Sequence, residues 1–251
     1  MIGNDVVLVG LHGSSGRMGQ SILQASESTP GIMIAHCYSK SSSGQDLDMM
    51  LRNCDVAIDF SASDALPLLL AKALQHKRAL VIGTTGISAL MFSEIKIAAQ
   101  QIPIFYSANM SLGVGLLAKI AKLAAGLLAQ QEYDVDIIEI HHKQKKDAPS
   151  GTALMLGQEI AQARGQNFDE IKVFGNIDGK TRKTGDLHFS SIRSGADIGQ
   201  HKIMFTSKDE ALSFEHKAYS RHLFAKGALR AAKWMHRKPS GFYSMDNLHD
   251  S

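Results

Sequence analysis

The chain has 251 residues, of which 44% are hydrophobic and 20% are charged. It can therefore bury one large core or two smaller ones, and it is neither disordered nor fibrous. A net charge of +3, spread over scattered lysines and arginines, excludes the strongly basic class that binds nucleic acid. With two cysteines and no basic-then-apolar leader at its start, we expect a cytoplasmic protein without a disulfide framework.

Short apolar runs alternate with longer helical patterns in the first half of the chain, as in repeated βαβ units. The crossover helices predicted by three- and four-residue spacing are 18–25, 65–75 and 90–99. The strands predicted around them are 6–9, 32–37, 56–60, 79–82 and 102–106. The pattern predicts an α/β fold with a Rossmann-like, doubly wound parallel sheet.

An apolar stretch at 110–129 follows. It carries Lys119 and Lys122 near its middle, and each would cost roughly 2.5 to 3.5 kcal/mol inside a bilayer. We therefore predict a buried helix that does not enter a membrane.

The pattern then changes to sheet. Residues 134–142 alternate, so that Val135, Ile137, Glu139 and His141 share one face. A helix at 150–164 and a helix at 220–236 that runs back onto the first domain are predicted, and the remaining strands are 171–174, 187–193, 201–206 and 211–217. This indicates an inserted α+β domain with one antiparallel or mixed sheet.

Gly13, Gly16 and Gly19 form a GxxGxxG pattern between the first strand and the first helix. Glycine allows the sharp turn and the close approach of a pyrophosphate, and the helix start offers free amides. A tight turn without a ligand is the alternative. The segments Asp59-Phe60-Ser61 and Gly83 to Gly86 follow later strands, and we expect them at the same carboxyl edge of the sheet.

The second strand is followed by Ser39 and Lys40, where NAD enzymes place an acid on the ribose. A carboxylate repels a 2′-phosphate, whereas serine and lysine attract it, so we expect NADPH to bind at least as well as NADH. A solvated Ser/Lys loop is the other interpretation.

Residues 139–153 hold two histidines, three lysines and a predicted helix start. His141 and His142 face opposite sides of a strand, so no metal site is predicted. A helix beginning after Pro149, with lysines nearby, fits a small dianionic substrate. A basic surface loop with a well-capped helix is the alternative.

These motifs, with Ser107 to Ser111, resemble the 4-hydroxy-tetrahydrodipicolinate reductase (dihydrodipicolinate reductase) family over essentially the whole chain. The resemblance implies NAD(P)H-dependent reduction of 4-hydroxy-tetrahydrodipicolinate in lysine biosynthesis through diaminopimelate, by a homotetramer. It implies a dinucleotide-binding domain at 1–111 and 220–251, and a substrate-binding and tetramerisation domain at 112–219. It makes His141 and Lys145 catalytic, and it makes His142, Gly151 and Thr152 substrate contacts. The cofactor contacts that it implies are Gly13, Ser14, Ser15, Gly16, Arg17, Met18, Ser39, Lys40, Gly83, Thr84, Thr85, Ser107, Ala108, Asn109 and Met110.

Two positions depart from the family pattern. Ser39 replaces a frequent acid, and Gln200 replaces the glutamate of a Gly-Glu-His segment. A protein that senses NADPH without turnover, or an NADPH oxidoreductase for an unrelated acid, are the competing hypotheses. Neither explains why lysines, histidines and a helix start occur together.

Overall fold

The computed structural model describes residues 6–175 and 181–250, without the side chains of residues 44 and 45. The first residues, which entered the expectation of no leader, lie outside this part. The chain divides into two compact units: Met1–Leu112 with Arg221–Ser251, called the terminal unit, and Gly113–Ser220, called the inserted unit.

The terminal unit contains a parallel sheet in the order β11-β5-β4-β3-β1-β2. The Rossmann-like prediction is confirmed. Strand β11 comes from the end of the chain and pairs with β5. The strands are β1 (Val7–His12), β2 (Ile32–Tyr38), β3 (Val56–Asp59), β4 (Ala79–Ile82), β5 (Pro103–Tyr106) and β11 (Gly241–Tyr243).

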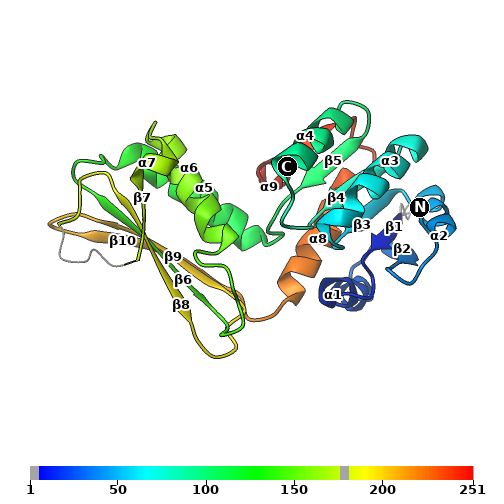
Figure 1. Ribbon diagram of the computed structural model, residues 1–251, viewed down its shortest axis with the longest axis horizontal. Coiled ribbons are helices and arrows are strands. Elements are labelled where there is room, and N and C mark those ends of the chain that lie inside the picture. The colour runs from blue at the N-terminus through cyan, green and yellow to red at the C-terminus, as the bar shows by residue number, and fades with distance from the viewer. Residues whose placement is uncertain (1–5, 176–180, 251) are drawn as a thin grey trace. The chain divides into compact units, whose positions relative to one another are not determined.

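Helices cover both faces of this sheet (Figure 1). One face packs on α1 (Arg17–Ser26) and α8 (His222–Met235), through Val7, Val9 and Leu11 of β1. The opposite core contains buried residues of β3, β4 and β5 and of three further helices. These helices are α2 (Gly44–Arg52), α3 (Leu66–His76) and α4 (Ala89–Ala98); the short elements are η1 (Ser63–Ala65) and α9 (Met245–His249).

Several boundaries differ from the predictions. Strand β1 runs to His12 because Gly10, Leu11 and His12 keep their pairing with β2 and β3. Strand β3 ends at Asp59, one residue earlier than predicted. Helices α2 and α9 and strand β11 were not predicted. Helix α2 is short and mostly polar, and its clearest signal was the capping box that Ser43 forms with Asp46.

The inserted unit contains a mixed sheet in the order β10-β9-β6-β8-β7, as predicted. Strand β6 pairs parallel to β8 and antiparallel to β9. The strands are β6 (Asp134–His141), β7 (Lys172–Phe174), β8 (Leu187–Arg193), β9 (Gln200–Thr206) and β10 (Ala211–Lys217).

Helices α5 (Leu112–Leu127) and α6 (Gly151–Ala163) share one core with this sheet, and the short α7 (Phe168–Ile171) follows α6 (Figure 1). Helix α5 is shorter than the predicted 110–129. Among residues 6–175 and 181–250, no helix has both the length and the apolarity needed to cross a membrane.

Candidate active site

The loop between β1 and α1 requires its glycines. Gly13 has φ +85°, and a Cβ there would lie 2.6 Å from the carbonyl oxygen of Phe60. A Cβ on Gly19 would lie 2.3 Å from the carbonyl oxygen of Gly13. Only glycine at position 19 therefore lets α1 pack this closely on the loop. Gly16 caps α1 without a side-chain hydrogen bond. The start of α1 is thus built as phosphate-binding helices are.

The other predicted residues of this loop differ in their surroundings. The hydroxyl of Ser14 donates to the carbonyl of Tyr38 at 3.2 Å, which ties the loop to the end of β2. Ser15 and Arg17 are exposed, whereas Met18 packs against the core.

Ser39 and Lys40 directly follow β2, at the carboxyl edge of the sheet. The backbone amide of Ser39 donates to the hydroxyl of Ser42 at 3.1 Å, and Lys40 is exposed. The next acid along the chain, Asp46, accepts a hydrogen bond from the Ser43 amide at 2.6 Å. That carboxylate is therefore engaged in capping α2.

The loops after β4 and β5 lie at the same edge. Gly83 is buried, and a Cβ there would lie 2.3 Å from the ring of Phe60. Thr85 is exposed, whereas the hydroxyl of Thr84 points inward and donates to Asp59 at 2.6 Å. The side chain of Thr84 therefore bonds within the protein.

After β5, the Ser107 hydroxyl donates to the carbonyl of Asn109 at 2.6 Å, and Ala108 is exposed. Met110 is 1% exposed and lies in the core. A Cβ on Gly227 of α8 would lie 1.7 Å from the Met110 carbonyl oxygen. Met110 is therefore packed against α8, and its side chain belongs to the core.

A buried carboxylate joins these loops, and sequence reasoning missed its role. Asp59 is fully buried at the end of β3. Its Oδ1 lies 2.6 Å from His12 Nδ1 and accepts from the Ser61 hydroxyl at 2.6 Å, while Oδ2 accepts from Thr84. We call His12, Asp59, Ser61 and Thr84 the Asp59 cluster. It connects the ends of β1, β3 and β4.

In the inserted unit, strand register gathers a second polar cluster. Glu139 of β6 pairs with Ser191 of β8 and with His201 of β9, and His141 pairs with Arg193. Glu139 and His141 are buried on the face predicted from the alternation. We call Glu139, His141, Ser150, Arg193 and His201 the Glu139 cluster.

Glu139 is the centre of this cluster. It accepts from His141 Nδ1, and Arg193 donates to both of its oxygens at 2.8 and 2.7 Å. The amide of Ser150 donates to Oε1 at 3.2 Å. Burial raises the pKa of Glu139, but the hydrogen bonds from His141 and Arg193 outweigh burial and lower this pKa to about 2.

His201 completes the cluster as a neutral ring. Its Nε2 lies 2.9 Å from the Ser150 hydroxyl, and its ring centroid is 5.2 Å from that of His141. Burial, and then the charge of His141, lower the pKa of His201 to about 3. A neutral His201 adds no positive charge beside the His141 ring.

The loop after β6 carries the predicted Lys145. Its Nζ donates to both oxygens of Asp147 at 2.9 and 2.8 Å, and Asp147 is exposed. His142 leaves the strand with its amide bonded to the carbonyl of Asp197 at 2.7 Å. Its buried Nδ1 has no hydrogen-bond partner within the described residues, which makes it a candidate ligand contact.

Helix α6 begins at Gly151, one residue later than predicted, because Ser150 is its N-cap. The Ser150 hydroxyl accepts from the amide of Ala153 at 3.1 Å. A Cβ on Gly151 would meet nothing within 4 Å. Gly151 and Thr152 thus form the first turn of α6, where backbone amides and the helix dipole attract a carboxylate.

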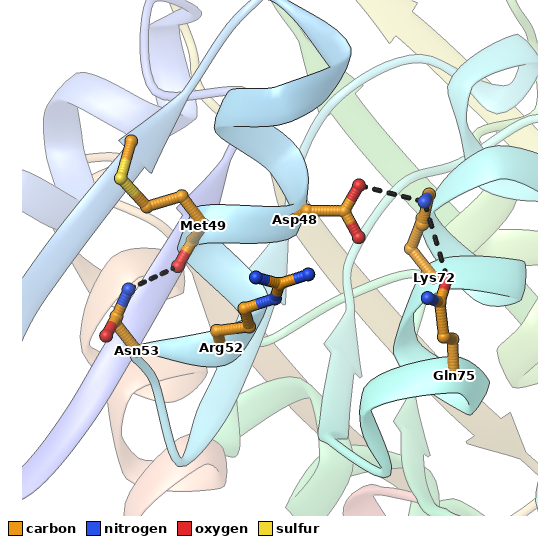
Figure 2. Close-up of a pocket in the computed structure, with 6 residues that line it drawn as sticks. All are labelled: Asp48, Met49, Arg52, Asn53, Lys72 and Gln75. Carbon is orange, nitrogen blue, oxygen red and sulfur yellow. Dashed lines mark hydrogen bonds and ion pairs between the residues drawn. The ribbon is translucent and has the colours of Figure 1, made fainter.

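A separate hollow of about 510 Å³ lies between α2 and α3, lined by Asp48, Met49, Arg52, Asn53, Lys72 and Gln75 (Figure 2). Asp48 and Lys72 form an ion pair of 2.8 Å across it. The residues from α2 run from its middle to its C-cap, and Lys72 and Gln75 lie in the C-terminal half of α3. Crossover helices run antiparallel to the strands of a parallel sheet. The hollow is therefore at the opposite edge of the sheet from the phosphate loop.

Comparison with known proteins decides the family. The model of the dihydrodipicolinate reductase N-terminus matches residues 7–110, and that of its C-terminus matches 113–248. The chain belongs to the dihydrodipicolinate reductase family. It is an NAD(P)H-dependent oxidoreductase of lysine biosynthesis through diaminopimelate. This membership favours the reductase over the nucleotide-sensing hypothesis and over an oxidoreductase for an unrelated acid.

Relatives agree over nearly the full length. The 4-hydroxy-tetrahydrodipicolinate reductase of Rickettsia rickettsii is 40% identical, over 96% of this chain and 98% of that relative. The enzyme of the same name from Wolinella succinogenes is 41% identical, over 95% and 97%. Among solved structures, the dipicolinate-bound dihydrodipicolinate reductase of Paenisporosarcina sp. TG-14 has a TM-score of 0.77 at 23% identity, over 96% of this chain and 99% of that chain. This likeness confirms the fold.

Proposed function

We propose that this chain reduces (2S,4S)-4-hydroxy-2,3,4,5-tetrahydrodipicolinate to 2,3,4,5-tetrahydrodipicolinate. Reduced nicotinamide, when bound, supplies a hydride to C4 of the ring. The 4-hydroxyl leaves as water after gaining one proton, which the protein must provide. Because the substrate is a dicarboxylate, the protein must also bind two carboxylates. The observation that carries the proposal is the position of Lys145 and the start of α6 beside the buried Glu139 cluster.

In this proposal Lys145 and His141 are the catalytic residues. An ordinary lysine pKa lies near 10.4 and an ordinary histidine pKa near 6.5, so lysine begins charged and histidine exchanges protons near neutral pH. Lys145 donates a proton and neutralises negative charge on the ring, and His141 assists it. To reach the ring, Lys145 has to exchange its bonds with Asp147 for bonds with the substrate.

The substrate contacts proposed are His142, Gly151 and Thr152. The buried Nδ1 of His142 gains a partner when a carboxylate or a bridging water binds. The first turn of α6 binds a carboxylate through its amides and dipole. Two anionic groups thus meet one helix start and one lysine, which matches the dianionic ring.

The nucleotide is proposed to bind the terminal unit along the loops that follow β1, β2, β4 and β5, as set out above. We infer that NADPH is preferred. Lys40 and the serines after β2 attract a 2′-phosphate, and the nearby Asp46 is turned into the cap of α2. The absence of an acid at Ser39 removes the usual bond to the ribose of NADH.

We also propose a homotetramer assembled through the inserted sheet. The face of this sheet away from α5 and α6 carries apolar side chains, among them Ile138, Ile140 and the exposed Ile192. Apolar groups of this kind are stabilised when a second sheet covers them. The cytoplasmic location stays a prediction.

NADPH oxidation by the full chain, with freshly generated 4-hydroxy-tetrahydrodipicolinate, tests the proposed function. We expect oxidation that depends on the substrate and is faster than with other small cyclic or open-chain acids. A chain that binds NADPH but oxidises it at the same rate with and without this substrate would contradict the proposal.

A further inference from the structure

We propose that Glu139 and Arg193 are positioning residues that hold His141, the Lys145 loop and the start of α6 in one arrangement. The inference rests on the proposed function, because it assumes that His141 takes part in proton transfer. Neither residue was singled out for a role by the sequence motifs. Both act through other groups and need not touch the substrate.

The first step of the argument is the burial of Glu139. Its side chain is 1% exposed, and an isolated carboxylate with so little water is strongly unfavourable. Here it accepts hydrogen bonds from His141, Arg193 and the Ser150 amide. These donors come from β6, from β8 and from the N-cap of α6. One charge therefore joins three segments.

The second step concerns the ring of His141. An ionised carboxylate only accepts, so His141 Nδ1 must carry a proton when it bonds to Glu139. Nε2 is then the nitrogen that takes up or releases the transferred proton. A Cβ on Gly199 would lie 3.0 Å from this Nε2. A side chain at Gly199 would therefore crowd the Nε2 side of the ring.

The third step concerns Arg193. Its guanidinium forms a two-pronged pair with Glu139 and also donates to the carbonyl of Asp147 at 2.5 Å. Asp147 holds the ammonium of Lys145. Arg193 thus links the carboxylate that orients His141 to the loop that carries Lys145. Lysine cannot reproduce this planar fork.

Other charged groups surround His141, and they enter any effect of pH. They are Glu139 on its own strand, Arg193 on β8, His201 on β9, His216 of β10 near His201, and Lys145 with Asp147 in the loop. Of these groups, only Glu139 forms a hydrogen bond with the His141 ring within the described residues. Removing the charge of Glu139 therefore acts directly on that ring, and it also weakens the pair with Arg193.

The test is the pH dependence of kcat in the full-length enzyme, with Glu139→Gln as the main variant. Loss of the anion makes the His141 cation less favourable, so the alkaline decrease of kcat should move to lower pH by about one unit or more. We expect kcat to fall about 10- to 100-fold, with the KM for NADPH changed less than about twofold. The control Glu215→Gln removes an exposed charge on β10 and should move neither quantity.

Arg193→Lys is the second variant if Glu139→Gln does not fold. It keeps the positive charge but removes the two-pronged pair with Glu139. It should lower kcat and leave the KM for NADPH unchanged. Nitrogen NMR of the His141 ring, assigned by comparison with His141→Asn, gives a readout that does not depend on activity. We expect the Nδ1–H tautomer in the wild-type chain and its loss or a lower titration pH in Glu139→Gln.

An Nε2–H tautomer in the wild-type chain overturns the proposal, as does an unchanged pH profile of kcat in folded Glu139→Gln. The NMR result stands even if the chain fails to reduce 4-hydroxy-tetrahydrodipicolinate. That failure would refute the proposed function alone, so the two outcomes can be told apart.

Discussion

The terminal and inserted units each contain a buried carboxylate that bonds to a histidine Nδ1, but the two carboxylates are balanced differently. Asp59 is held by His12 and by the hydroxyls of Ser61 and Thr84. Glu139 is held by His141 and by the charged fork of Arg193. Hydroxyl donors fix the ends of strands, whereas a guanidinium keeps a carboxylate ionised beside a proton-transfer site.

This difference matches the function proposed for each unit. Backbone amides bind a nucleotide, so the terminal unit needs its loops at fixed positions. A reacting ring needs side chains with defined charge, so the inserted unit needs a fixed anion near His141. The comparison predicts that changes to each cluster affect different measurable quantities.

The largest effect is expected from Lys145→Ala. Removing a proton donor from the inserted unit should lower kcat by about 10² to 10⁴-fold. The Kd for NADPH, measured by fluorescence titration, should stay the same because the proposed nucleotide contacts belong to the terminal unit. The control is Lys208→Ala, an exposed lysine in the turn after β9. Normal turnover by Lys145→Ala would refute the assigned role.

Asp59→Asn should act on the nucleotide. It leaves His12 and Thr84 with a weaker acceptor, and a disturbed buried hydrogen bond costs about 1 to 3 kcal/mol. We expect the Kd for NADPH to rise about 5- to 100-fold, while the pH profile of kcat keeps its position. Thr84→Ser keeps the hydroxyl and is the mild control. A shifted pH profile with unchanged NADPH affinity would contradict the division between the units.

Lys40→Ala sharpens the cofactor side of the comparison. Loss of one charged contact to a 2′-phosphate costs about 1 kcal/mol at an exposed site, so the KM for NADPH should rise about fivefold. The KM for NADH should not change. Arg52→Ala removes a positive charge from the hollow in Figure 2 and should alter neither KM. Equal effects of Lys40→Ala on both nucleotides would argue against a 2′-phosphate contact.

The smallest effect concerns stability and pH. The pKa of His201 falls from its ordinary 6.5 to about 3 on folding, so the unfolded chain binds more protons between these values. Wild-type stability should therefore decrease as pH falls from 6.5 toward 3. Measured by calorimetry, the Tm of His201→Asn should fall less between pH 7 and pH 5 than the Tm of the wild type. His36→Asn, on β2 of the other unit, is the control, and parallel curves would contradict this account.

The sequence predicted the sheets but not their clusters. Alternation in β6 placed Glu139 and His141 on one face, because period two is a local property of a strand. Arg193 and His201 reach the same site only through the register of β8 and β9, which no local pattern encodes. His12 similarly meets Asp59 across 47 positions. The polarity of His201 within the apolar alternation of β9 was the one available signal.

The central claim is hydride transfer from bound nicotinamide to C4 of a dianionic ring. NADPH carrying deuterium at both C4 positions of its nicotinamide tests it directly. With freshly generated 4-hydroxy-tetrahydrodipicolinate, the account predicts one deuterium at ring C4 of the product for each NADPH oxidised, read by mass spectrometry and NMR. Deuterium found at another ring position, or oxidised nucleotide without labelled product, would contradict it.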